Sequence, residues 1–285
     1  MISATVGGIT FSSDPVIRFG ITSFDGWRGS PPVKTQLQDR ANSDGMFGVS
    51  KFLRGARPIT LAGRYTGTGE DAETYDQYDA LAALLADGAP TTLTVTDPGG
   101  TASAQVILYG DGSTLTQLVN GLADYVITFV APDPVKYGPA KTYSTGLSTA
   151  GGGLEYNLFA GGAGGTLFYG ALGALGRVSV VNTGHADVWP VFSITGGLDS
   201  GFFIQWLETG QVLRYDRVVP LGTFVQLDSR TGEVLIDGVS DSSTYLTRDE
   251  WFAIPAKGSA TLQLNAIGGS TGLPLMTVSS WDGSW

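Results

Sequence analysis

Residues 123–130 read ADYVITFV, so the apolar side chains of Tyr125, Ile127 and Phe129 recur at every second position. This period places one row of side chains on one face of the backbone and predicts a β-strand with a buried face. The next residues, APDP at 131–134, include two prolines, which lack the N–H donors of a strand ladder and restrict the residues before them. The strand therefore ends here, and a first domain is predicted to span residues 1–141.

Further runs of the same kind precede this strand and lie at 59–65, 93–95 and 106–108. A different spacing, typical of an α-helix, occurs at about 71–86. It is set by Tyr75, Tyr78, Ala82 and Leu85. Acidic residues in the first turn and a glycine after the last agree with the charge and backbone preferences of helix ends. The first domain is therefore predicted to be a β-barrel or sandwich with one helix.

The second half of the chain consists of a glycine-rich stretch followed by short strands. Eleven glycines lie between residues 144 and 176, interleaved with apolar side chains, so residues 142–176 are predicted to be an ordered connector. Strand and turn signals then alternate through residues 177–285 and predict an antiparallel β-sandwich. A fragment from residue 176 to 285 is expected to fold alone.

The composition excludes several classes of function. The 285 residues contain no cysteine and one histidine, His185, so thiolate chemistry and most zinc sites are excluded, and no cofactor or metal is expected. No catalytic motif accompanies His185, and no catalytic residue is predicted. The formal net charge of −10 disfavours a protein that wraps nucleic acid. Neither an export signal nor a membrane-spanning segment is expected.

Aromatic residues of the second half support one binding hypothesis. Trp206, Tyr215 and Trp251 are candidate glycan contacts, because exposed rings on a β-sandwich can stack on sugars. Packing of these rings in the core between the sheets is the stronger interpretation.

Several segments resemble distal tail, or minor tail, proteins of bacteriophages with long non-contractile tails. In the first half they are FLRGARPITLAG at 52–63, YDALAALL at 78–85 and FVAPDPVKYG at 129–138. In the second half they are VNTG at 181–184, WPVFSITG at 189–196, LDSRTGE at 227–233 and IPAKG at 254–258. The resemblance implies a tail-tube-like first domain and a galectin-like or carbohydrate-module-like second domain.

The resemblance also implies a function. Members of this family are structural virion proteins of siphoviruses, not enzymes, and form a hexameric ring at the distal end of the tail. The ring joins the tail tube to the tail tip or baseplate, and DNA passes through its channel. Expected partners are other copies of the chain, the tail tube protein, the tape measure protein and other tail-tip proteins. Assembly is expected in the cytoplasm of the bacterial host.

Charge is segregated within the first domain. Residues 28–64 hold seven basic against two acidic side chains, whereas residues 65–135 hold ten acidic and no basic ones. A bipolar domain suits head-to-tail contacts between copies. The predicted interface pairs Lys51, Arg54, Arg57 and Arg64 with Glu70, Glu73, Asp76 and Asp79 of a neighbour. Pairing within one copy is the alternative.

The net charge also bears on the channel, whose lumen is expected to be negative so that passing DNA does not adhere. A carbohydrate-binding module or glycan-active protein that uses the second domain is the alternative function.

Overall fold

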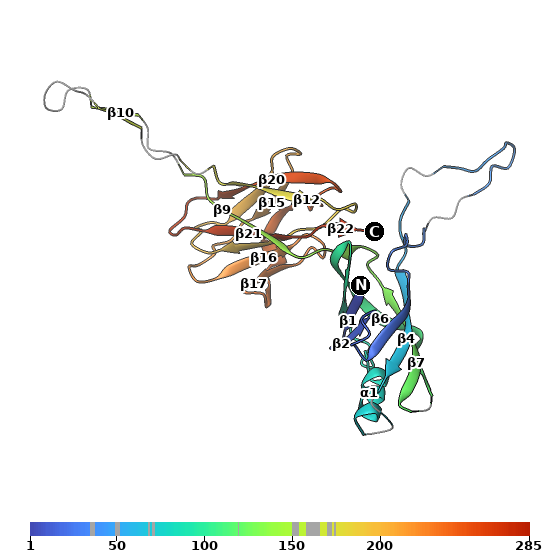
Figure 1. The fold of residues 1–285 in the computed structure, drawn as a ribbon. Helices are drawn as coiled ribbons and strands as arrows, with labels where there is room; N and C mark the ends of the chain where they lie inside the picture. The colour runs from blue at the N-terminus through green and yellow to red at the C-terminus, as the bar shows by residue number, and fades with distance from the viewer. Residues whose placement is uncertain are drawn as a thin grey trace. The chain divides into compact units, whose positions relative to one another are not determined.

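The computed structural model describes residues 1–34, 38–48, 52–67, 69, 72–118, 120–149, 154–157, 166–169, 173 and 175–285. The described chain is mainly β and forms two compact units (Figure 1). Unit 1 comprises Met1–Pro139 with Gly283–Trp285, and unit 2 comprises Ala140–Asp282. The chain therefore passes between the units twice. This architecture confirms the predicted mainly β, two-domain fold.

Unit 1 is a closed barrel of seven strands, because its first sheet closes through a pairing of β6 with β7. The strands are β1 (Ser3–Val6), β2 (Ile9–Ser12), β3 (Phe19–Asp25), β4 (Arg57–Thr66), β5 (Thr91–Asp97), β6 (Gly100–Gln117) and β7 (Leu122–Ala131). Two short strands, β8 (Lys136–Tyr137) and β22 (Gly283–Ser284), extend the sheet beyond β6. Barrel closure leaves few unpaired strand edges.

The barrel interior is filled by the predicted alternation. Tyr125, Ile127 and Phe129 of β7 are at most 1% exposed, as expected from their period of two. The hydroxyl of Tyr125 donates to the carbonyl of Gly20 at 3.0 Å. A Cβ at Gly63 would lie 2.4 Å from this hydroxyl, so glycine lets the strand backbone and the ring approach closely.

The helix α1 (Ala72–Ala82) is confirmed, and of the four residues predicted to set its face Tyr78 and Leu85 are buried. Thr74, Tyr78 and Leu81 are buried, whereas Tyr75 is 45% exposed and Ala82 is exposed. The helix is also shorter than residues 71–86, because the chain turns after Ala82 and Leu85 takes a left-handed φ of 56°. Gly88, at φ 71°, has the left-handed conformation that the sequence predicted. Residue 71 lies outside the described residues.

Unit 2 contains two antiparallel sheets. The five-stranded sheet has the order β12 (Arg177–Asn182), β20 (Gly258–Ala266), β14 (Phe202–Trp206), β15 (Val212–Tyr215) and β19 (Leu246–Asp249). The six-stranded sheet has the order β18 (Ser240–Asp241), β17 (Val234–Ile236), β16 (Phe224–Asp228), β13 (Val191–Thr195), β21 (Leu275–Ser280) and β9 (Lys141–Gly146). A 3-10 turn, η1 (Ser243–Tyr245), precedes β19.

Side chains from both sheets of unit 2 meet around Phe252. Its ring lies 5.8 Å from that of Phe192 in the six-stranded sheet and 5.2 Å from that of Trp206 in the five-stranded sheet. All three residues are buried. Aromatic packing of this kind fills the space between two sheets and holds them as a sandwich.

The start of unit 2 differs from the predicted connector at 142–176. Strand β9 pairs with β21 over six residues, from Lys141 opposite Ser280 to Gly146 opposite Leu275, and is therefore part of the second core. Within the connector, β10 (Leu154–Asn157) and β11 (Thr166–Tyr169) form an antiparallel hairpin. Residues 150–153, 158–165, 170–172 and 174 lie outside the described residues.

None of the helices in the described part of the chain has the length and apolar character needed to cross a membrane.

Two fragments of unit 2 test whether the pairing of β9 with β21 stabilises this unit. We expect residues 140–282 to melt cooperatively and residues 176–282, which lack β9, to melt at a lower temperature. The reason is that removal of β9 leaves β21 as an edge strand and uncovers the backbone donors and acceptors that β9 pairs. Differential scanning calorimetry of both fragments measures the difference. Equal melting temperatures would show that β9 adds nothing to the second core.

Candidate functional site

Between β3 and β4, unit 1 carries a ribbon whose described residues are 28–34, 38–48 and 52–56; we call these residues the arm. Two antiparallel bridges hold the two halves of the arm together, Val33 opposite Arg54 near the barrel and Asp39 opposite Met46 near the tip. In Figure 1 the arm projects away from the barrel as the blue segment at the upper right. The arm is therefore a β-ribbon in its described residues.

The root of the arm is fixed by the buried side chain of Arg57, which is 1% exposed. Its Nη1 donates to the carbonyls of Gly26 and Gly29 at 2.7 Å and of Trp27 at 3.2 Å, and its Nε donates to Pro134 at 3.0 Å. Burial lowers the pKa of this guanidinium. One cation thus joins the start of the arm to the end of the segment that follows β7.

A second buried cation lies beside the first. Lys136 is 6% exposed, and its Nζ donates to the carbonyl of Trp27 at 2.8 Å and lies 5.3 Å from the centre of the Trp27 ring. Burial, and to a smaller extent the charges of Arg57 and Arg28, lower the pKa of Lys136 to about 8. Asp97, which pairs with Arg28, opposes this shift.

The arm exposes large apolar side chains to water. The exposed fractions are 45% for Val33, 51% for Met46, 60% for Phe47, 50% for Phe52 and 61% for Leu53. Burial of each such side chain is worth about 1.5–3 kcal/mol. Apolar side chains gathered on a projecting ribbon are typical of a surface that another protein covers.

The structure separates the predicted interface residues into groups. Arg57 does not reach a surface, because its guanidinium is buried among carbonyls of its own unit, so its replacement by Glu would disrupt the fold and not only an interface. Arg64 bonds Asp124, with Nε and Oδ1 2.7 Å apart, and lowers the pKa of that carboxyl. Glu73 pairs with Arg18. For Arg64 and Glu73 the alternative of pairing within one copy therefore holds.

The remaining members of the set lie on the surface or outside the described residues. Asp76 and Asp79 are exposed on α1. Arg54 is partly exposed, donates to the carbonyl of Pro31 at 3.3 Å and lies 6.0 Å from the ring of Trp285. Residues 51 and 70, Lys51 and Glu70 of the predicted set, are not among the described residues.

Two of the three candidate glycan contacts in unit 2 lie in the core. Trp206 is 8% exposed, and Tyr215 is fully buried, with its hydroxyl 2.7 Å from that of Ser242. Trp251 is partly exposed. A ring that stacks on a sugar needs an accessible face, so Trp206 and Tyr215 follow the stronger interpretation, packing in the core.

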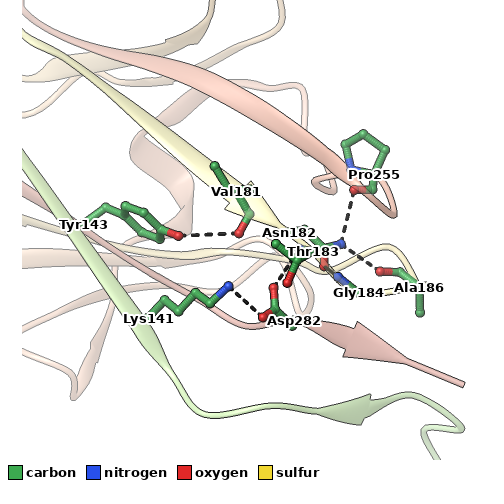
Figure 2. Close-up of polar contacts among 9 residues, drawn as sticks. All are labelled: Lys141, Tyr143, Val181, Asn182, Thr183, Gly184, Ala186, Pro255 and Asp282. Carbon is green, nitrogen blue, oxygen red and sulfur yellow. Dashed lines mark hydrogen bonds and ion pairs between the residues drawn. The ribbon is translucent and has the colours of Figure 1, made fainter.

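The loop after β12 is organised by a buried amide in unit 2. Asn182 is fully buried, and its Nδ2 donates to the carbonyls of Ala186 at 2.8 Å and Pro255 at 3.2 Å (Figure 2). It also donates to the carbonyl of Ile254 at 3.3 Å. Its Oδ1 accepts a hydrogen bond from the backbone of Gly184 at 2.9 Å. One side chain therefore ties this loop to the segment before β20.

The same loop connects to both ends of unit 2. Asp282, the last residue of the unit, accepts a hydrogen bond from the backbone of Thr183 at 2.7 Å and pairs with Nζ of Lys141 at 2.6 Å (Figure 2). Tyr143 donates to the carbonyl of Val181 at 3.4 Å. These bonds hold together the points at which the chain enters and leaves the unit.

Among the described residues, no group of three or more His, Asp or Glu side chains could hold a metal ion. His185 is exposed on the loop after β12.

Sequence reasoning did not identify the apolar surface of the arm. It emphasised the cations of residues 28–64, whereas the structure adds the exposed Met46, Phe47, Phe52 and Leu53. The available signal was apolar side chains within a Gly- and Pro-rich segment that no helical or strand period placed in a core.

The chain matches no protein-family model and no curated protein. It is similar in structure to the Dit (gp 19.1) protein of SPP1, presented as a paradigm of the hub adsorption apparatus in phages that infect Gram-positive bacteria, with 14% identity and a TM-score of 0.68. The alignment covers 99% of each chain. It is also similar to a chain of the phage P2 baseplate in its activated conformation with Ca, with 11% identity, a TM-score of 0.56 and 98% of each chain covered. At these identities the likeness establishes a shared fold.

The lowered pKa of Lys136 predicts that unit 1 becomes more stable as the pH rises from 7 to 9.5. Above about pH 8 the folded state has released a proton that the unfolded state still binds, so the free energy of unfolding increases with pH, by up to about 2 kcal/mol at pH 9.5. Urea unfolding at both pH values, compared with Lys136→Met, isolates this contribution. The same pH dependence in Lys136→Met would contradict this assignment.

The bonds of Asn182 predict that Asn182→Ala destabilises unit 2. The substitution leaves buried carbonyls without a donor, and we expect the free energy of unfolding to fall by about 2–4 kcal/mol. His185→Ala, at an exposed position of the same loop, is the matched control and should change it by less than about 0.5 kcal/mol. Thermal melting of both variants distinguishes these results, and an unchanged melt of Asn182→Ala would refute the role of the amide.

Proposed function

We propose that this chain is a structural distal tail protein of a phage with a long non-contractile tail. Six copies would form a ring that joins the tail tube to the tail tip or baseplate and lets DNA pass through its channel. The observation that carries the proposal is the likeness to SPP1 Dit over 99% of both chains, which includes both units in the same order. A likeness confined to one unit would support only a shared module.

The surface of unit 1 supports assembly into a closed ring. The arm exposes apolar side chains and cations, while Asp76 and Asp79 expose carboxylates on α1. Two different surfaces on one subunit suit a heterologous contact, which closes as a ring when the rotation allows it. The function proposed here requires this kind of contact.

The proposed function also implies the partners of the chain, its location and its lack of catalytic activity. The partners would be other copies of the chain, the tail tube protein, the tape measure protein and further tail-tip or baseplate proteins. The protein would act in the virion at the distal end of the tail, after assembly in the host cytoplasm, and would catalyse no reaction. The excess of acidic residues supports a negative lumen that repels passing DNA.

The structure weakens the alternative of a glycan-binding module. The rings of Trp206 and Tyr215 pack in the core of unit 2. They could stack on a sugar only if unit 2 unfolded. Trp251 alone of the three is partly exposed, and one ring provides a weaker platform than three.

The proposed function predicts six copies on the tail axis. Symmetry analysis of electron micrographs of tails that contain the chain measures both quantities, with a tag on unit 2 to locate it. A copy number other than six, or a position away from the distal tail axis, would overturn the proposal. Retention of the purified chain on a glycan column, with no ring in tails, would favour the alternative function.

A further inference from the structure

Unit 1 has a groove of about 570 Å³ beside the carboxyl end of α1, which we call the α1 groove. Its lining includes Gly7, Ile9, Ala83, Leu84, Leu85 and Asp87. Leu84 and Leu85 are buried and give the groove an apolar floor. Gly7 packs against this floor, since a Cβ there would lie 2.4 Å from Cδ1 of Leu84. The groove is thus an open recess with a partly apolar lining and one carboxylate, Asp87.

The surroundings of the α1 groove are acidic. Asp76 and Asp79 are exposed on α1, and residues 65–135 contain no Lys or Arg. Arg18 and Arg64, which come from outside this segment, pair with Glu73 and Asp124. The groove therefore favours an occupant that combines apolar side chains with positive charge.

The part of the arm nearest the barrel, residues 32–34 and 52–55, has this combination; we call it the proximal ribbon. Val33, Phe52 and Leu53 are each 45–61% exposed, and Lys34 and Arg54 lie beside them. Backbone hydrogen bonds from Lys34 to Leu53 at 2.8 Å and from Gly55 to Pro32 at 2.7 Å keep it extended. An ordered ribbon loses less conformational entropy on docking than a free loop does.

The tip of the arm fits the groove less well. It carries Asp39 and Asp44 against one cation, Arg40, whose guanidinium lies over the ring of Phe47 at 5.8 Å. Negative charge at the tip would face the carboxylates around the groove. The charge pattern therefore selects the proximal ribbon over the tip.

We propose that the proximal ribbon of one copy docks in the α1 groove of a second copy of this chain. The inference rests on the proposed ring function and names the contact that would build the ring. The arm ends where β4 begins, at Arg57, and α1 follows the end of β4, at Thr66. Ten strand residues separate these ends by about 30 Å, and the arm projects away from the barrel (Figure 1), so the two surfaces meet between copies.

Chemical cross-linking tests this contact, because the sequence contains no cysteine. One full-length protein carries Leu53→Cys in the ribbon, and another carries Ala83→Cys in the groove. Both positions are exposed, so both proteins should fold. With a short bismaleimide, we expect cross-linked dimers in the mixture and none in either protein alone. Val239→Cys, at a residue 84% exposed in unit 2, replaces Leu53→Cys in the control mixture and should give no dimer.

Charge reversal tests the electrostatic part of the contact. Lys34→Glu in the ribbon protein should lower the yield of cross-linked dimer about fivefold, the change expected from loss of one exposed ion pair. Asp87→Lys in the groove protein should restore that yield. An unchanged yield with Lys34→Glu, or no recovery with Asp87→Lys, would contradict the assigned charges.

Cross-linking of a chain that carries both cysteines, after its incorporation into tails, tests the docking contact separately from the proposed function. A ladder of cross-linked species up to the hexamer supports both. Six copies at the distal tail axis without a ladder would overturn the docking contact and retain the function. Equal cross-linking in each single-cysteine protein would indicate a two-fold symmetric contact and would also overturn the inference. Absence of the chain from tails would refute the proposed function itself.

Discussion

The guanidinium of Arg57 is the interaction on which the arrangement of unit 1 depends. A buried cation is unfavourable unless polar groups replace the water that it loses. Here carbonyls of Gly26, Trp27, Gly29 and Pro134 do so for Nη1 and Nε, at distances of 2.7–3.2 Å. These carbonyls belong to segments that sheet pairing does not join, so the cation fixes where the arm leaves the barrel and where the chain leaves β7.

Burial of Lys136 beside Arg57 adds a constraint on the same region. Two cations in contact with backbone carbonyls repel each other, and the lowered pKa of Lys136 reflects its burial first and this repulsion second. Asp97 supplies negative charge nearby through its pair with Arg28. In unit 2 a neutral side chain joins separate backbone segments. Asn182 both donates to and accepts from backbone groups, without the cost of burying a charge.

The sequence predicted the elements whose local pattern matches their burial. The period of two in Tyr125, Ile127 and Phe129 identified a core strand, and the helix near residues 72–82 was located from its spacing. It identified only part of the buried face of that helix, because Thr74 is buried while the larger Tyr75 is exposed and accepts a hydrogen bond from Gln117 at 3.0 Å. Residue type alone favoured Tyr75 as the buried residue.

The candidate site was harder to predict, because charge in a sequence does not reveal burial. Arg54 and Arg57 are three residues apart in one basic segment, yet one is partly exposed and the other lies among carbonyls. The carbonyl partners of Arg57 are separated from it by between 28 and 77 positions along the chain, so no local pattern identifies them. The exposed side chains of the arm likewise become informative only once the core is known to exclude them.

The distribution of the remaining exposed charges has a consequence for symmetry. Lys34 stands on the arm, whereas Asp76, Asp79 and Asp87 lie at the α1 end of the barrel. An isologous contact of proximal ribbon against proximal ribbon would place cation against cation, and one of helix against helix would place carboxylate against carboxylate. A heterologous contact brings opposite charges together in every interface. Like charges gathered at one end destabilise a lone subunit through repulsion, and a head-to-tail contact relieves this repulsion. The charge pattern of the exposed residues therefore favours a head-to-tail contact over an isologous one.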